Sequence, residues 1–291
     1  TLNAATRPMT AQRNRLAVTL TGLVIAVIGS IVLARLELGN LRAAFETDAR
    51  IIHRLLSQRT AQHDAVMAML ALLQSNRAEQ PEQRIPSVYP QILKVQQRRD
   101  AEAWADPALS AAEEESQRSR RAAVAGVDFA QGRYQLVQAA GNNGYAAQID
   151  LQGMVPWEEW PMSPESSPVR VTLEYAGQHF VLQPGQEGGG PWTFNFRKRL
   201  AADSQPFDVV AVRGAAWSDL PWIKMLGWTL LTAVALAALL ALERQRAERR
   251  RAEELLRLGQ VARLNTLGEL AAGLAHELNQ PLTALSTYGS A

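Results

Sequence analysis

Two long apolar runs stand out in the pattern of hydrophobic and polar positions. Residues 16–33 read LAVTLTGLVIAVIGSIVL without a charge, and residues 220–242 read LPWIKMLGWTLLTAVALAALLAL with a single lysine near the start. Crossing the ~30 Å hydrocarbon core of a bilayer takes about twenty helical residues. The sequence therefore predicts transmembrane helices over residues 16–36 and 220–242.

A cleaved signal peptide is the alternative for the first run. However, the run is longer than an ordinary signal-peptide core, and a charged, helix-like segment follows where small residues would mark a cleavage site. These two features favour a retained membrane anchor.

Between the two runs, apolar residues first recur at the three- and four-residue steps of a helix. The recurring positions are Leu41, Phe45, Ile52, Leu55, Val66, Leu70 and Leu73. This spacing predicts an amphipathic helix that continues out of the first run. A second, polar helix is expected over about Ile92–Trp104, before Pro107.

After Arg121 the pattern changes to short segments rich in β-branched and aromatic residues. The predicted strands are 123–129, 134–139, 145–151, 169–175, 180–183, 192–196 and 207–212. Residues 169–183 are predicted to form a hairpin that turns at Ala176-Gly177. Helices followed by antiparallel strands indicate an α+β domain over residues 37–219. This order of elements resembles the PDC or Cache class of extracytoplasmic sensor domains.

Charge predicts which side of a membrane each segment occupies. Arginines flank the two runs: Arg7, Arg13 and Arg15 precede the first, and Arg244, Arg246, Arg249, Arg250 and Arg251 follow the second. Basic flanks stay in the cytoplasm. Residues 1–15 and 243–291 are therefore expected in the cytoplasm, and the α+β domain in the periplasm of a bacterial inner membrane.

Composition excludes several other classes of function. A nucleic-acid-binding protein would carry basic residues on a folded face with aromatics among them, whereas acidic residues outnumber basic ones over 37–219. No nucleic-acid partner is therefore expected. The absence of cysteine excludes disulfides, zinc-thiolate sites and thiol catalysis. His276-Glu277 matches the start of a zinc-protease HExxH motif, but Gln280 stands where its second histidine is needed, so no metal site is expected.

The periplasmic domain is expected to bind a small molecule. Arginine and aromatic side chains can clamp an anionic or amphipathic ligand. The candidate pocket residues are Arg133, Tyr134, Trp157, Trp160, Tyr175 and Trp192. The alternative is that the aromatics pack in the sheet core and Arg133 is solvated.

Beyond Leu242 the chain is rich in Ala, Leu, Arg and Glu, with no proline before Pro281, which predicts one long helix. An apolar seam at three- and four-residue steps comprises Leu264, Leu267, Ala271, Leu274, Leu278, Pro281 and Leu285. Such a seam pairs two helices, so a homodimer is expected. Before Leu264 the spacing drifts to threes, which makes 243–263 a coiled-coil linker in which a register change can pass a signal. Residues 264–291 then form a dimerisation helix.

His276 falls on the outward face of this predicted helix, since Leu274 and Leu278 lie on the seam. An exposed imidazole at neutral pH is mostly uncharged, so a ring nitrogen can act as a nucleophile. By itself, a surface histidine beside a glutamate is usually only solvated helix surface.

The surrounding residues change that interpretation. The segment AHELNQPL, residues 275–282, resembles the H-box of sensor histidine kinases of two-component systems, in particular the subgroup with C4-dicarboxylate-sensing and FixL-type kinases. The resemblance implies that His276 accepts the γ-phosphoryl group of ATP and that Glu277 acts as general base. Gln280 occupies the place where many relatives have Asn or Thr for dephosphorylating the partner, which leaves its phosphatase role open.

The resemblance also implies ATP, Mg²⁺ and a cognate response regulator as cofactors and partner of the parent protein. No nucleotide-binding boxes follow His276, so the chain as given is expected to be inactive, as a truncated first helix of the dimerisation and phosphotransfer domain. The alternative from a non-enzymatic class is a transmembrane receptor whose coiled-coil stalk docks a signalling partner.

Overall fold

The structure is a computed structural model that describes residues 7–72, 81–100, 102–186 and 189–288. Side chains are described from residue 16 to residue 268, with gaps that include 73–83 and 266. The chain divides into two compact units. One comprises Thr1–Leu33 with Trp222–Ala291, and the other, here called the outer domain, comprises Ala34–Pro221.

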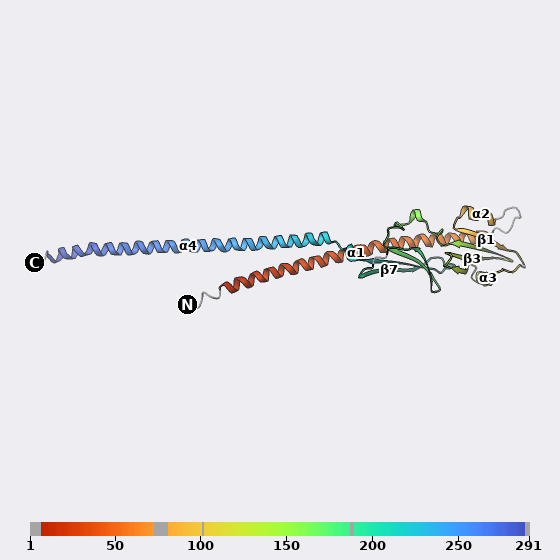
Figure 1. The fold of residues 1–291 in the computed structure, drawn as a ribbon, viewed down its shortest axis with the longest axis horizontal. Helices are drawn as coiled ribbons and strands as arrows, with labels where there is room; N and C mark the ends of the chain where they lie inside the picture. The colour runs from red at the N-terminus through yellow and green to blue at the C-terminus, as the bar shows by residue number, and fades with distance from the viewer. Residues whose placement is uncertain (1–6, 73–80, 101, 187–188, 289–291) are drawn as a thin grey trace. The chain divides into compact units, whose positions relative to one another are not determined.

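Two long helices, α1 (Arg7–Leu72) and α4 (Trp222–Tyr288), carry the two apolar runs (Figure 1). Each contains a stretch that is long and apolar enough to cross a membrane, and none of the residues in these stretches is buried. Because α1 is unbroken from Arg7, the helix does continue out of the first run, as its periodicity predicts.

Small residues let the apolar stretches of α1 and α4 approach each other. The indole Nε1 of Trp228 donates a hydrogen bond to the Ile25 carbonyl at 3.3 Å, and a Cβ at Gly29 would lie 2.0 Å from that nitrogen. At Gly22 a Cβ would lie 3.0 Å from the Leu236 side chain. Apolar helices associate through such close packing, since lipid removes the hydrophobic drive between them.

The outer domain has two antiparallel four-stranded sheets. Its first half comprises α2 (Pro81–Val88), β1 (Ile92–Arg98), α3 (Pro107–Ser119), β2 (Ala123–Asp128), β3 (Arg133–Ala140) and β4 (Asn143–Asp150), with strand order β1-β4-β3-β2. Its second half comprises β5 (Val169–Tyr175), β6 (Gln178–Gln183), β7 (Trp192–Arg199) and β8 (Asp208–Ala215), with order β6-β5-β8-β7. Short 3₁₀ turns cover Trp157–Glu159 and Trp217–Asp219. The α+β class is confirmed.

The last part of α1 lies along these sheets and provides one side of the core (Figure 1). Phe45, Ile52, Leu56, Met67 and Leu70 recur on its apolar face, and each is at most 1% exposed. Burying a side chain of this size contributes about 1.5–3 kcal/mol. The helix is therefore an integral part of the outer domain.

All seven predicted strands are present, and the predicted hairpin is confirmed. Ala176 and Gly177 both have positive φ, 48° and 81°, as a tight two-residue hairpin turn requires.

The polar helix predicted over Ile92–Trp104 is wrong. Residues Ile92–Arg98 form strand β1, which pairs with β4, because the backbone hydrogen bonds and the burial of Ile92 and Val95 outweigh weak local helix propensity. The helix of this region is α3 instead. Asp106 caps it by accepting a hydrogen bond from the Ala108 amide at 2.9 Å, and Pro107 is its first residue.

Candidate functional site

Helix α4, which ends at Tyr288, includes His276, Glu277 and Gln280. The single long helix predicted beyond Leu242 is therefore present. The structure does not describe the side chains of these three residues, so their roles stay predictions.

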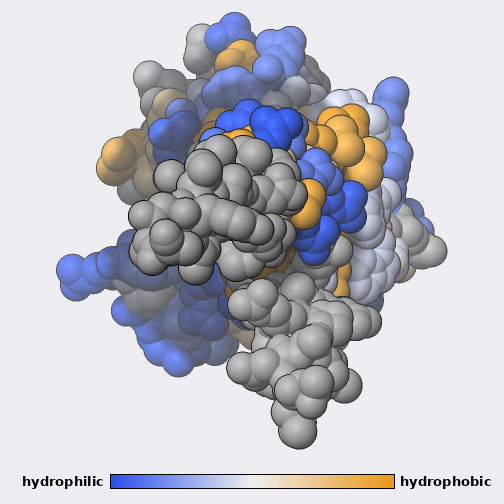
Figure 2. All heavy atoms as spheres, turned by 90° about the vertical axis from the view of Figure 1, so that its left-hand side faces the viewer, coloured by the Kyte–Doolittle hydropathy of each residue, from blue (hydrophilic) through white to orange (hydrophobic). Residues whose placement is uncertain are grey.

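Upstream of His276, α4 leaves large apolar side chains exposed. Between half and three quarters of their surface is accessible for Leu255, Leu256, Leu258, Val261, Leu264 and Leu267. The arginines beside them are exposed as well. Figure 2 shows hydrophilic residues with hydrophobic ones among them, around the atoms drawn in grey. Large exposed apolar patches are typical of interaction surfaces.

Two of the predicted pocket residues are buried in the outer domain. Tyr134 is 1% exposed and packs edge-on against Phe207, with ring centroids 5.0 Å apart. Trp160 is 8% exposed, and its indole donates a 2.7 Å hydrogen bond to Gln183, which is itself fully buried.

The other four predicted pocket residues are at least partly exposed. Arg133 is exposed at the start of β3. The ring centroids of Trp157 and Trp160 are 5.5 Å apart. The ring centroids of Tyr175 and Phe207 are 5.4 Å apart, and those of Trp192 and Trp217 are 5.0 Å apart. These contacts join Trp157 to Trp160, and they join Tyr134 to Tyr175 through Phe207. These ring contacts do not join all six residues into one group, and their shared ligand role stays a prediction.

One of them, Tyr175, does line a cavity of about 270 Å³, here called the Arg121 cavity. The cavity lies where the end of α3 and the start of β2 meet β5 and the connection between β7 and β8. Its side chains with polar groups are Glu115, Ser119, Arg121, Tyr175, Asp203 and Ser204. Arg121 and Asp203 form an ion pair of 2.6 Å, with both side chains well exposed.

A buried polar network lies directly behind Ser204. The Ser204 hydroxyl donates to the Asp64 carboxylate of α1 at 2.6 Å, and the Gln205 amide donates to Asp64 at 2.9 Å. The Tyr134 hydroxyl donates to Gln205 Oε1 at 2.5 Å and lies 3.1 Å from Nδ1 of His63. The network therefore joins α1 to β3 and to the β7–β8 connection.

Burial shifts the pKa values of this network. It lowers the pKa of the His63 imidazole to about 4, since Nε2 is buried without a hydrogen-bond partner and a second proton there would be costly. It raises the pKa of the Asp64 carboxyl, against the opposite effect of the hydrogen bonds from Ser204 and Gln205. Both groups are thus biased toward their uncharged forms.

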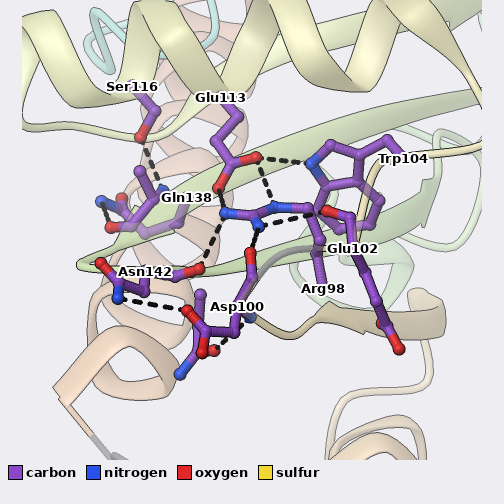
Figure 3. A network of polar contacts seen from close by, with 10 residues as sticks. Arg98, Asp100, Glu102, Trp104, Glu113, Ser116, Gln138 and Asn142 are labelled. Carbon is purple, nitrogen blue, oxygen red and sulfur yellow. Dashed lines mark hydrogen bonds and ion pairs between the residues drawn. The ribbon is translucent and has the colours of Figure 1, made fainter.

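A second network holds α3 against the first sheet (Figure 3). Glu113 accepts two hydrogen bonds from Arg98, at 2.9 and 2.8 Å, and one from the Trp104 indole at 2.7 Å. Arg98 also donates to the carbonyl of Asn142 at 3.0 Å, while Ser116 accepts from the Ala139 amide at 3.0 Å. Since the charged groups of this network are paired with one another, it is a structural clamp that positions the wall of the Arg121 cavity.

Arg121, Asp203 and Ser204 were not among the residues singled out from the sequence. The Asp106-Pro107 pair is a cap signal that predicts α3, and hence the position of Glu115 and Ser119. No local signal joins Arg121 to Asp203, because they are 82 positions apart in the chain. Over the part of the chain that the structure describes, no group of three or more His, Cys, Asp or Glu side chains is placed to hold a metal ion.

Comparison with known proteins yields a short match. No family model matches the chain. The sensor protein FixL of Bradyrhizobium diazoefficiens is 50% identical over 46 residues, which are 16% of this chain and 9% of FixL. The chain thus matches less than a tenth of the length of this relative, and the similarity supports a relationship to a sensor kinase over one segment only.

Proposed function

We propose that the parent protein is a sensor histidine kinase of a two-component system, which detects a stimulus in the periplasm and phosphorylates itself on His276. The observation that carries the proposal is the H-box-like segment 275–282 on α4. A match at 50% identity over 46 residues to a sensor protein supports it. An α+β domain between two helices able to span a membrane is consistent with this function.

In the proposed reaction His276 is the nucleophile. A ring nitrogen attacks the γ-phosphorus of ATP, the bond to the bridging oxygen breaks, and ADP leaves. Glu277 accepts the proton lost from the other ring nitrogen, as a general base. ATP supplies the phosphoryl group, and Mg²⁺ neutralises its charge. Both would be bound outside these residues, and the phosphoryl group would pass to an aspartate of the response regulator.

The exposed apolar residues of α4 support a homodimer. Leu264 and Leu267 are 68% and 63% exposed, and they begin the predicted seam of three- and four-residue steps. Pairing with a second copy would bury them. A stimulus that moves α1 against α4 would then change the pairing of this linker and the access of ATP to His276.

The test is autophosphorylation of the full-length parent protein with γ-labelled ATP and Mg²⁺. We expect an alkali-stable label on the wild-type protein, no label on His276→Gln, and a loss of roughly a hundredfold or more in rate for Glu277→Gln. His179→Gln is the matched control, since His179 is exposed on β6 and is expected to leave labelling unchanged.

Undiminished labelling of His276→Gln would refute the assignment of the phosphoacceptor. An unlabelled wild-type protein would favour the alternative, a receptor whose stalk only docks a partner. Gln280→Ala, assayed for dephosphorylation of the phosphorylated regulator, decides whether Gln280 takes part in phosphatase activity.

A further inference from the structure

The Arg121 cavity is a half-open hollow large enough for a small molecule. It is formed by segments of both sheets, and the Ser204 side of its wall is buried, with only 7% of Ser204 exposed. The volume of about 270 Å³ is several times the roughly 30 Å³ that a water molecule takes up, so a molecule of many non-hydrogen atoms can fit.

Charges of both signs line this cavity. Arg121 provides one cation, and Asp203 and Glu115 provide two carboxylates, of which Glu115 also pairs with Arg118 at 3.0 Å. The Tyr175 ring adds an aromatic surface to the lining. A guanidinium binds a carboxylate with two parallel hydrogen bonds, and carboxylates bind an ammonium group. The lining is therefore complementary to a small molecule that carries both groups.

The Arg121–Asp203 ion pair in the lining can open at little cost. Arg121 and Asp203 are 63% and 81% exposed, and an exposed pair of this kind contributes only about 0–1 kcal/mol. A ligand that offers a carboxylate to Arg121 and an ammonium to Asp203 replaces one pair by two. The pair thus holds the two charges in place beside the cavity.

The cavity is also coupled to α1. Ser204 lines it and at the same time donates to Asp64 on α1 at 2.6 Å. Its neighbour Gln205 is fully buried and bonds both Asp64 and the Thr60 carbonyl of the same helix. A ligand that moves the segment 203–205 therefore acts directly on the helix that continues into the apolar run 16–33.

We propose that the Arg121 cavity binds a free α-amino acid as a zwitterion, with its carboxylate on Arg121 and its ammonium between Asp203 and Glu115. That this ligand is the stimulus rests on the proposed function. The binding itself does not.

The experiment is calorimetric titration of the 291-residue chain in detergent with each of the twenty standard L-amino acids. For each amino acid that binds, the matching amine without the carboxylate and the matching acid without the amine are titrated as well. We expect at least one amino acid to bind and both of its truncated analogues to bind more weakly, by roughly 10- to 100-fold each. A thermal midpoint raised by about 5–10 °C at a hundredfold excess over Kd is the corresponding stability readout.

Arg121→Gln is the decisive variant, and we expect it to lose roughly 10- to 100-fold in affinity. Arg197→Gln is its matched control, since Arg197 also forms a 2.6 Å ion pair, to Glu174, and is 58% exposed, but does not line the cavity. The control is expected to bind like the wild type. Because both arginines are exposed, neither change should prevent folding.

Three results would overturn the proposal: no binding by any of the twenty amino acids, equal binding of a truncated analogue, or wild-type affinity in Arg121→Gln. The titration needs no ATP, so its outcome is independent of the phosphorylation assay. Binding without labelling at His276 would refute the kinase alone, and labelling without binding would refute the amino-acid site alone.

Discussion

The outer domain and the part of α4 beyond Leu242 differ in the exposure of their leucines. Leu56 and Leu70 of the outer domain are 0% and 1% exposed, whereas Leu264 and Leu267 of α4 are 68% and 63% exposed. The outer domain encloses its apolar side chains within one chain. The helix α4 leaves its own leucines exposed in the single chain. The comparison teaches that the outer domain has an apolar core of its own, whereas burial of the α4 leucines depends on the association proposed above.

The largest effect is expected from breaking the clamp of the outer domain. Glu113→Ala leaves the Arg98 guanidinium, which is 13% exposed, without its buried partner. Removing one partner of a buried pair costs about 3–5 kcal/mol, because the remaining charge stays desolvated. Denaturant unfolding of the detergent-solubilised chain, followed by tryptophan fluorescence, measures the loss.

Glu115→Ala is the matched control for this variant. Glu115 lies on the same helix and pairs with Arg118 at 3.0 Å, but both side chains are more than half exposed. We expect a change of at most about 1 kcal/mol. Similar losses for the two variants would show that the clamp is not a buried pair.

A somewhat smaller effect is expected from acid. The pKa of His63 is lowered from 6.5 to about 4, so the folded state resists a proton that the unfolded state accepts. The stabilisation is complete above pH 6.5 and is lost as the pH falls toward 4, by about 3 kcal/mol in total. Unfolding free energies measured between pH 7 and pH 4 test this slope.

His63→Asn should flatten that slope, because asparagine can still donate to the Tyr134 hydroxyl but does not titrate. The comparison of the two proteins isolates His63, since the raised pKa of Asp64 acts in the opposite sense in both. His179→Asn is the control, as His179 is exposed. An equal slope in His63→Asn and the wild type would contradict the assignment.

The smallest effect on the stability of the single chain is expected from Leu267→Ala. The same change is expected to weaken dimerisation clearly. Its side chain is exposed in the single chain, so the outer domain should keep its stability. If Leu267 lies on a dimer seam, burial is lost at the interface, and dimerisation weakens by about 2 kcal/mol, or roughly 30-fold. Energy transfer between labelled copies in detergent measures the dissociation constant.

Leu256→Ala is the matched control, because Leu256 is 70% exposed but lies off the predicted seam. A dimer that is weakened equally by both variants, or by neither, would place the contact elsewhere. Either result would contradict the predicted seam, and neither would bear on the burial of leucines in the outer domain.

Much of the fold could be predicted because its signals are local. The hairpin strand Val169–Tyr175 has the bounds that its β-branched residues predict, and the turn at Ala176-Gly177 follows from conformations that glycine favours. The error over Ile92–Trp104 has the opposite origin. A short polar segment has no strong preference of its own, and pairing with β4, about 50 positions later, made Ile92–Arg98 a strand.

Of the candidate site, the sequence by itself determined the apolar runs, their arginine flanks and the H-box-like segment around His276. These are local patterns, and their chemistry depends on neighbours along the chain. The tertiary structure alone decided that Tyr134 is buried beside His63, that Arg121 meets Asp203, and that Ser204 reaches Asp64 on α1. Those contacts join residues separated by 71 to 140 positions, and only the packing of α1 and the two sheets with one another brings them within hydrogen-bonding distance.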